Sequence, residues 1–160
     1  MFDAKYKIQN TRYKRGFTLI EMLLVITIIA LLASLTLVGM GGARAKSRDS
    51  RRIADLHGTM NALELYYAKY YFYPSTNSWQ GLIDILTDSS TGVGVSKIAK
   101  DPLNSTGWTY YYGRSSNGQD YVIGAKLETK DPALDDDIDG SVYGVDCGSV
   151  VDDTIYCIRP

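Results

Sequence analysis

The sequence predicts an α+β fold, in which a long N-terminal helical spine carries a small antiparallel β-sheet head. Three observations predict it. Residues 17–40 form an apolar run with a single charge, a second stretch ending before Pro74 repeats apolar residues at helical spacing, and aromatic and β-branched runs alternate with turn residues in the C-terminal half. The 160 residues suffice for one domain with a modest core plus one long element.

Charge divides the chain into a basic leader and an acidic body. Residues 1–16 hold five basic residues and one acidic residue, a net +4, whereas the remainder sums to −5 and the whole chain to −1. Counterion release on nucleic acid requires clustered Lys and Arg. We therefore expect no nucleic-acid partner.

The apolar run over residues 17–40 contains one charge, at Glu21. As a helix, these residues extend about 36 Å, enough to cross a hydrocarbon core of about 30 Å. Because Lys and Arg precede the run, its C-terminal side is expected outside the cytoplasm. A secretory signal fits poorly, since its apolar region is about 7–15 residues long and ends in a small-residue cleavage site. We expect a membrane-spanning helix within residues 17–42.

The junction before this run resembles a known processing site. Residues 14–21 read Lys-Arg-Gly-Phe-Thr-Leu-Ile-Glu, and this order resembles the cleavage site of type IV prepilins and type II secretion pseudopilins. The close match covers about residues 14–40. It implies a pilin-like fold, removal of the leader 1–16 by a prepilin peptidase after Gly16, and N-methylation of the new terminus at Phe17. A plain signal-anchored protein is the alternative.

The resemblance also explains Glu21. A carboxylate at bilayer depth costs about 2.5–3.5 kcal/mol on insertion scales. In filaments of this family, the carboxylate at this position is thought to neutralise the free amine at the Phe17 position of a neighbouring subunit, and a buried charge is tolerable when it is paired. The implied assembly residues are Phe17 and Glu21.

The resemblance implies partners and a location as well. The partners are further copies of the chain in a helical filament, minor pilins or pseudopilins, the prepilin peptidase and an inner-membrane assembly platform. The chain is expected in the cytoplasmic membrane as a single-pass protein before assembly, with its C-terminus outside. After assembly it is expected in an extracellular pilus or a periplasmic pseudopilus.

Residues 43–73 read as the amphipathic half of the spine. An apolar stripe recurs at spacings of three and four, and consists of Ile53, Leu56, Met60, Leu63, Tyr67 and Tyr70. Pro74 ends it. We expect the stripe to pack on the sheet, with a partner coiled coil as the alternative. Glycines at 39, 41 and 42 mark either a kink in one spine of about 84 Å or a break between two helices.

A basic cluster follows the apolar run and comprises Arg44, Lys46, Arg48, Arg51 and Arg52. We expect these residues near lipid headgroups before assembly and near acidic residues of adjacent subunits afterwards. DNA binding is a weaker alternative, because the stretch lacks interleaved aromatic residues for base stacking. The single histidine, His57, is interpreted as an exposed or hydrogen-bonded helix residue.

Residues 74–160 form the predicted head. A short helix is expected over 79–86 and a hairpin of strands 108–112 and 121–127 around the turn 113–120. A last strand is expected over 154–158. If the head lies outside the cytoplasm, Cys147 and Cys157 are expected to form a disulfide worth about 3 kcal/mol, with free thiols as the alternative.

An acidic loop carries the only metal-like pattern. Asp135, Asp137 and Asp139 precede Gly140 as in the opening of a calcium loop, and Asp146 falls where a bidentate Glu normally completes the shell. Major pseudopilins bind calcium in a C-terminal loop, so the resemblance points the same way. We expect weak Ca²⁺ binding, with a solvated acidic surface as the alternative.

The sequence supports no enzyme, since it has one histidine and no phosphate-binding glycine loop. The favoured function is a structural subunit of a type IV pilus-like filament, because the C-terminal disulfide loop resembles that of many pilins. The alternative is the major pseudopilin of a type II secretion system. It is favoured by Asp101-Pro102 ahead of a Tyr-rich run, although the Trp-Gly usual in that pattern is missing. A monomeric membrane-anchored calcium-binding module is a third, weaker possibility.

Overall fold

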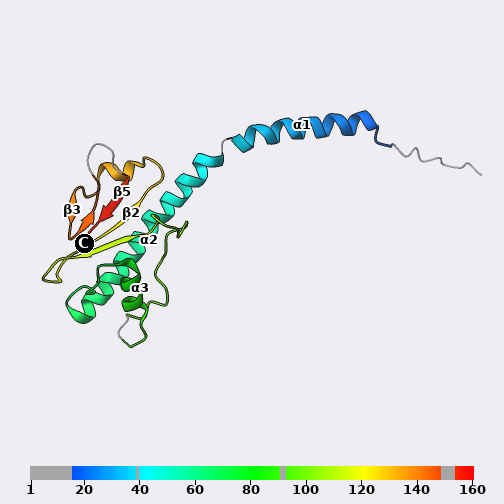
Figure 1. The fold of residues 1–160 in the computed structure, drawn as a ribbon. Helices are drawn as coiled ribbons and strands as arrows, with labels where there is room; N and C mark the ends of the chain where they lie inside the picture. The colour runs from blue at the N-terminus through cyan, green and yellow to red at the C-terminus, as the bar shows by residue number, and fades with distance from the viewer. Residues whose placement is uncertain (1–15, 39, 91–92, 149–153) are drawn as a thin grey trace, which may run out of the picture. The chain divides into compact units, whose positions relative to one another are not determined.

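The computed structural model describes residues 16–38, 40–90, 93–148 and 154–160 (Figure 1). The chain divides into two units, one ending at Met40 and the other comprising Gly41–Pro160. The first unit contains helix α1 (Leu19–Val38), and helix α2 (Met40–Tyr70) belongs almost entirely to the second. The spine is therefore described as two helices, and residue 39 between them lies outside the described residues.

Helix α1 begins directly after Phe17 because Thr18 caps it. The Thr18 hydroxyl accepts a hydrogen bond from the Glu21 amide at 3.3 Å, as an N-cap residue does. The hydroxyls of Thr27 and Ser34 donate to the carbonyls of Leu24 and Leu31 at 2.7 and 2.8 Å, which satisfies them within the helix.

Across the described ranges, no helix combines the length and the apolarity that crossing a membrane requires. A membrane-spanning helix within residues 17–42 stays a prediction.

Helix α2 packs its apolar stripe into the core of the head, as predicted. Leu56 and Leu63 are fully buried, and the other four members of the stripe pack around them. The helix ends at Tyr70, because Tyr71 adopts φ +63 and leaves the right-handed region. This left-handed conformation costs a residue other than glycine roughly 1–2 kcal/mol.

A three-stranded antiparallel sheet lies against this helix in the order β1 (Tyr111–Arg114), β2 (Tyr121–Lys126), β5 (Ile155–Ile158). Its register pairs Tyr112 with Ile123 and Gly124 with Cys157. The central strand is buried on both faces. One face joins the core with α2 and with α3 (Trp79–Thr87), and the other faces a smaller cluster that includes the disulfide.

That second cluster is covered by a hairpin of two short strands, β3 (Ser141–Val142) and β4 (Val145–Asp146), which the sequence did not predict. A short 3₁₀ helix, η1 (Pro132–Asp135), precedes it. Glycine at 124 is required by close packing, since a Cβ there would lie 2.8 Å from the Cys157 sulfur.

The remaining elements agree with the predictions except at one strand boundary. α3 and β5 match residues 79–86 and 154–158 within one residue. The hairpin is present, but β1 starts three residues later than predicted and continues through Gly113 and Arg114, so the connecting turn covers only residues 115–120.

Candidate functional site

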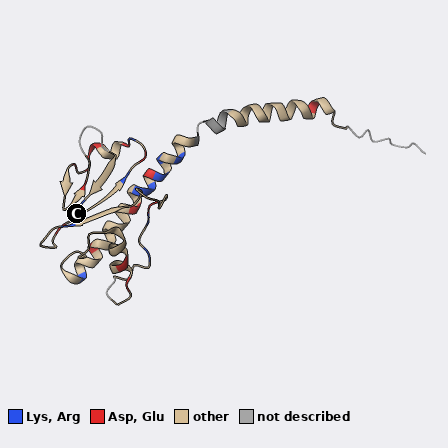
Figure 2. Ribbon diagram, viewed as in Figure 1, with Lys and Arg blue, Asp and Glu red and all other residues tan. Residues whose placement is uncertain are grey.

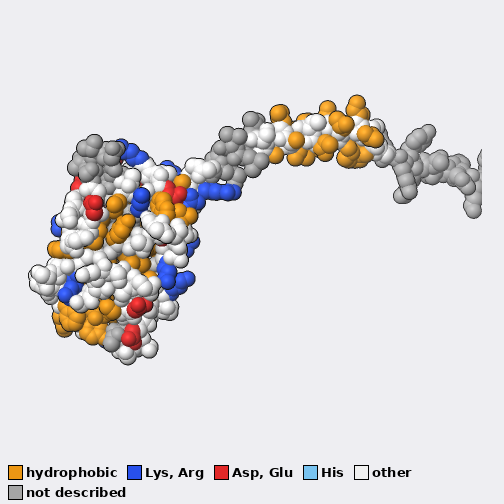
Figure 3. Space-filling view, viewed as in Figure 1, with side chains coloured by type: hydrophobic (Ala, Val, Ile, Leu, Met, Phe, Trp, Pro, Cys, Tyr) orange, Lys and Arg blue, Asp and Glu red, His pale blue; other side chains and the backbone are white. Residues whose placement is uncertain are grey.

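The predicted processing and assembly residues lie at the start of α1, exposed to solvent. Gly16, Phe17 and Glu21 are all exposed, and so are the apolar side chains that follow, with Leu19 83% exposed. Figure 3 shows hydrophobic side chains on the visible face of this helix. An apolar surface of this extent requires cover by lipid or by protein. Cleavage after Gly16 and methylation at Phe17 stay predictions.

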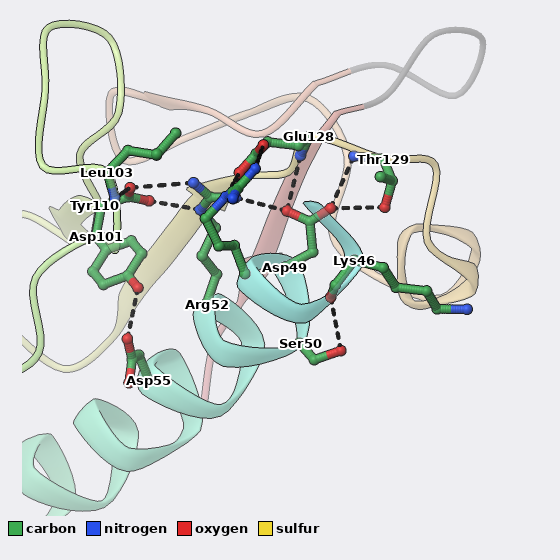
Figure 4. A network of polar contacts seen from close by, with 11 residues as sticks. Lys46, Asp49, Ser50, Arg52, Asp55, Asp101, Leu103, Tyr110, Glu128 and Thr129 are labelled. Carbon is green, nitrogen blue, oxygen red and sulfur yellow. Dashed lines mark hydrogen bonds and ion pairs between the residues drawn. The ribbon is translucent and has the colours of Figure 1, made fainter. Parts of the chain in front are cut away.

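The most elaborate polar site of the head surrounds Arg52, which is fully buried (Figure 4). Its guanidinium donates to both oxygens of Asp101, from Nε at 2.6 Å and from Nη2 at 3.2 Å. Its Nη1 donates to Asp49 and to Glu128, each at 2.7 Å. The guanidinium carbon also lies 4.5 Å from the centre of the Trp108 ring. A charge in the core is thus fully compensated.

The carboxylate of Asp49 completes this network. It accepts hydrogen bonds from the backbone amides of Glu128 and Thr129 at 2.9 and 2.8 Å, and from the Thr129 hydroxyl at 2.7 Å. Arg48 adds two further hydrogen bonds to Glu128. The network joins α2 to two distant segments, residues 101–103 and residues 127–129. These hydrogen bonds fix the position of the C-terminal end of β2 relative to α2.

Electrostatics within the network follow from this geometry. The hydrogen bond from Arg48 is the main reason that the pKa of Glu128 falls to about 2. Burial, the largest single effect, would raise the pKa of Asp101 and lower that of Arg52. The hydrogen bonds and opposite charges around each group together outweigh it, so the pKa of Asp101 is lowered and that of Arg52 raised. All three groups remain charged throughout the physiological pH range.

Asp101 also shapes its own loop. Its Oδ1 accepts the Leu103 amide at 2.8 Å, an Asx-type turn that Pro102 favours at the intervening position. The Asp-Pro pair that the sequence singled out therefore has a structural role, which is to present a carboxylate to Arg52. Sequence analysis did not identify this pairing; the only local signal was Asp49 at i,i+3 from Arg52.

The predicted role of the basic cluster requires a correction. Arg52 is buried and so faces neither headgroups nor neighbouring subunits, and Arg48, which is partly exposed, pairs with Glu128 of its own chain. Arg44, Lys46 and Arg51 remain exposed on α2. Figure 2 shows this concentration of basic residues along the first turns of that helix.

The acidic loop does not assemble a metal site in this structure. Asp137 accepts the Cys157 amide at 2.7 Å, and Asp146 accepts the Gly148 amide at 3.2 Å. Asp135 and Asp139 are exposed. Within the described residues, no group of three or more His, Cys, Asp or Glu side chains is placed to hold a metal ion. The structure therefore does not bring the four predicted ligands together, and calcium binding stays a prediction.

The predicted disulfide between Cys147 and Cys157 is present. It joins the hairpin to β5, and the Cys147 amide donates to Gly140 O at 2.8 Å to close the loop. His57 is exposed, with Nε2 3.5 Å from the Tyr156 hydroxyl, in agreement with its interpretation as a surface helix residue.

Comparison with known proteins gives a match to one family model and to several curated relatives. A family model described as the prokaryotic N-terminal methylation motif matches residues 11–37. The type II secretion system core protein G of Escherichia coli (strain K12) is 34% identical over 116 residues, 72% of this chain and 75% of that protein. The protein of the same name from Klebsiella michiganensis is 31% identical over 131 residues, 78% of this chain and 91% of the relative.

A third protein of that name, from Aeromonas hydrophila, is 31% identical over 118 residues, 68% of this chain and 77% of its own length. No solved structure matches the chain. These relatives favour the pseudopilin alternative over the pilin interpretation that the sequence suggested first. The chain belongs to the family of type IV pilins and type II secretion pseudopilins, and it is a structural subunit and not an enzyme.

Proposed function

We propose that the chain is the major pseudopilin of a type II secretion system, cleaved after Gly16 and methylated at Phe17. The observation that carries this proposal is the 34% identity that extends over three quarters of the E. coli core protein G. That match reaches beyond the N-terminal motif, which covers only residues 11–37. Similarity of the head is what separates this proposal from a general filament subunit.

Assembly is proposed to run through α1. Cleavage leaves Phe17 with a cationic amine, one residue before the helix cap at Thr18. Glu21 lies in the first turn, where the helix dipole favours a negative charge. In an apolar surrounding a lone carboxylate is costly, and pairing with the amine of a neighbouring copy removes much of that cost. The pairing therefore favours the polymer over the separate subunit.

The exposed side chains of α1 account for the two proposed locations. Lipid at the cytoplasmic membrane covers them before assembly, and the helices of other copies cover them in a periplasmic pseudopilus. The proposed partners are further copies of the chain, minor pseudopilins, the prepilin peptidase and the inner-membrane assembly platform. The head is the rigid part, fastened to the spine by the Arg52 network.

A type IV pilin is the second candidate, and the Cys147–Cys157 loop is the observation that favours it. Both candidates share the same cleavage and methylation, so the N-terminus does not separate them. The two candidates differ in where the filament is found, outside the cell for a pilin and in the periplasm for a pseudopilin.

Mass spectrometry of native cells tests the proposal. We expect a chain that begins at methylated Phe17, recovered from the envelope fraction, and a deletion strain that no longer releases its secreted enzymes. Abundant recovery in filaments sheared from the surface, with secretion intact, would instead support the pilin. A Gly16→Trp variant is the control for processing and should accumulate as the uncleaved precursor. An unprocessed wild-type chain contradicts both candidates.

A further inference from the structure

The C-terminal end of α2 carries an exposed aromatic surface, here called the aromatic tip, formed by Tyr70, Tyr71 and Phe72. Tyr71 is 74% exposed and Phe72 is 41% exposed. Figure 3 shows hydrophobic side chains gathered at this end of the head, which Figure 1 identifies as the end of α2. Two neighbouring large apolar side chains left uncovered on a head of this size call for a partner.

The backbone at Tyr71 strengthens this argument. Tyr71 occupies the left-handed region at φ +63, where glycine is the favoured residue. Its amide donates to Tyr67 O at 2.7 Å and its carbonyl accepts from the Gln119 side chain at 3.0 Å, so the main chain is held in place. Its ring stacks on no other aromatic residue of the described chain. A strained position thus presents a ring that its own chain does not use.

The N-terminal half of the same helix presents exposed cations. Arg44 and Arg51 are seven residues apart and so share one face of α2. Arg51 has a side chain 67% exposed and only a loose 3.9 Å contact with Asp55. Arg44 is exposed and makes no ion pair with any described residue. Tyr71 lies 27 residues beyond Arg44, about 40 Å along a helix, so the two ends cannot meet within one chain.

We propose that the aromatic tip of one copy receives Arg44 and Arg51 of a second copy of this chain. The proposal rests on the filament proposed above. A helical polymer grows through a heterologous interface, in which two different surfaces of the same chain meet head to tail. The aromatic tip and this arginine pair are two such surfaces, and they lie at opposite ends of one helix.

The chemistry of the two surfaces is complementary. Arginine stacks on aromatic rings through its planar guanidinium. The head already places an arginine in this way, with Arg52 over Trp108 at 4.5 Å, and it places Lys69 over Tyr70 at 5.0 Å. Near the tip, α2 carries both a cation, Lys69, and an anion, Glu64, which accepts a hydrogen bond from the Tyr73 hydroxyl. Because both signs of charge lie beside the tip, net charge does not attract the arginine of a second copy. The exposed ring of Tyr71 is the feature that binds it.

Substitution of Tyr71 separates folding from assembly. Tyr71→Gly relieves the left-handed backbone and removes the ring, so the subunit should melt at a higher temperature or unchanged while filament yield falls a few-fold. Tyr71→Phe keeps the ring and should assemble as the wild type does. Arg44→Ala with Arg51→Ala should reproduce the loss. Lys46→Ala is the matched control, because Lys46 lies about 160° around the helix from Arg44 and about 140° from Arg51.

Cross-linking in the filament tests the contact itself. Copies carrying Ser47→Cys and copies carrying Ala68→Cys are expressed together, and filaments are treated with a short bismaleimide; both positions are exposed, and the two arginines and the Tyr71 ring stay in place. Cys147 and Cys157 are joined to each other and do not compete. Mixed dimers joined between positions 47 and 68 support the proposal. If these dimers are absent, or if Tyr71→Gly assembles fully, the proposed contact is wrong. As long as wild-type filaments form, that result does not affect the proposed function. Absence of wild-type filaments overturns both.

Discussion

Arg52 and Asp101 form a buried ion pair with two hydrogen bonds, at 2.6 and 3.2 Å, between residues 49 positions apart in the chain. Neither side chain is more than 2% exposed. The pair lies where the spine meets the loop that leads into the sheet. Either charge alone would destabilise the folded state, because desolvation of a lone buried ion costs several kcal/mol.

Removal of the carboxylate should therefore destabilise the head strongly. Asp101→Ala leaves one side of the guanidinium without an acceptor, and we expect a loss of about 3–5 kcal/mol in the free energy of unfolding. Urea unfolding followed by tryptophan fluorescence measures it. Asp84→Ala, at an exposed position on α3, is the control and should change the stability by less than about 0.5 kcal/mol. A loss below 1 kcal/mol for Asp101→Ala would contradict the network's importance.

Acid should weaken the same network. The pKa of Glu128 is lowered from 4.5 to about 2, mainly by the hydrogen bond from Arg48. Because the folded pKa lies below the unfolded one, the stabilisation is complete above pH 4.5 and is lost as the pH falls toward 2. After screening by solvent, we expect a loss of about 1–2 kcal/mol over this window. Glu128→Gln should make the melting temperature depend less on pH in this window. An unchanged pH dependence would show that other carboxylates dominate the acid sensitivity.

The sequence predicted those elements whose signals are local. The stripe through Leu56 and Leu63 repeats at the helical period, so it predicts α2 and the face that it buries. The turn residues between β1 and β2 predict the hairpin. Strands β3 and β4 have two residues each and are too short to show any period.

The missed features depend on pairings that sequence spacing does not reveal. Arg52 meets Asp101 and Glu128 at separations of 49 and 76 residues, so nothing in the basic cluster distinguishes it from exposed Arg51. In the acidic loop, by contrast, the sequence predicted a cluster of ligands that the structure does not bring together. Its carboxylates match a calcium pattern in type and order, but the motif takes no account of the Cys157 and Gly148 amides that two of them bind instead.

Loss of the disulfide should loosen the outer face of the sheet. The Cys147–Cys157 bond closes a loop of about 11 residues and packs against Val122, so Cys147→Ser with Cys157→Ser should cost roughly 3 kcal/mol. Differential scanning calorimetry of the oxidised chain and the double variant measures the change. The Arg52 network lies on the other side of β2, so the acid sensitivity described above should persist in the double variant.

Calcium binding by the acidic loop is an independent prediction. We expect millimolar Ca²⁺ to raise the melting temperature, with a dissociation constant of about 10⁻⁴–10⁻³ M as in extracellular modules. Asp137 and Asp146 each accept a backbone amide through one carboxylate oxygen, so binding requires the four side chains to converge and not the loss of these hydrogen bonds. Asp135→Asn with Asp139→Asn should abolish the rise, whereas Asp84→Asn should not. No shift at 10 mM Ca²⁺, about tenfold above the top of that range, would show that this loop does not bind calcium.

Neutralising Glu21 should block assembly without blocking cleavage. Glu21 follows the junction at Gly16 by five residues, so Glu21→Ala is expected to be processed normally, which the mass of the mature chain shows. The amine of a neighbouring Phe17 then has no counter-charge in an apolar surrounding. Loss of one partner of a buried pair is strongly destabilising, and we expect filament yield to fall at least tenfold.

Two further variants separate charge from helix packing. Glu21→Gln keeps the shape of the side chain but not its charge, and it should fail as Glu21→Ala does. Ser34→Ala removes a hydroxyl that only contacts its own helix at Leu31 O, and it should assemble normally. If Glu21→Gln assembles, the side chain acts by packing and the proposed charge pair is wrong. If every variant leaves filament yield unchanged, α1 assembles without this carboxylate.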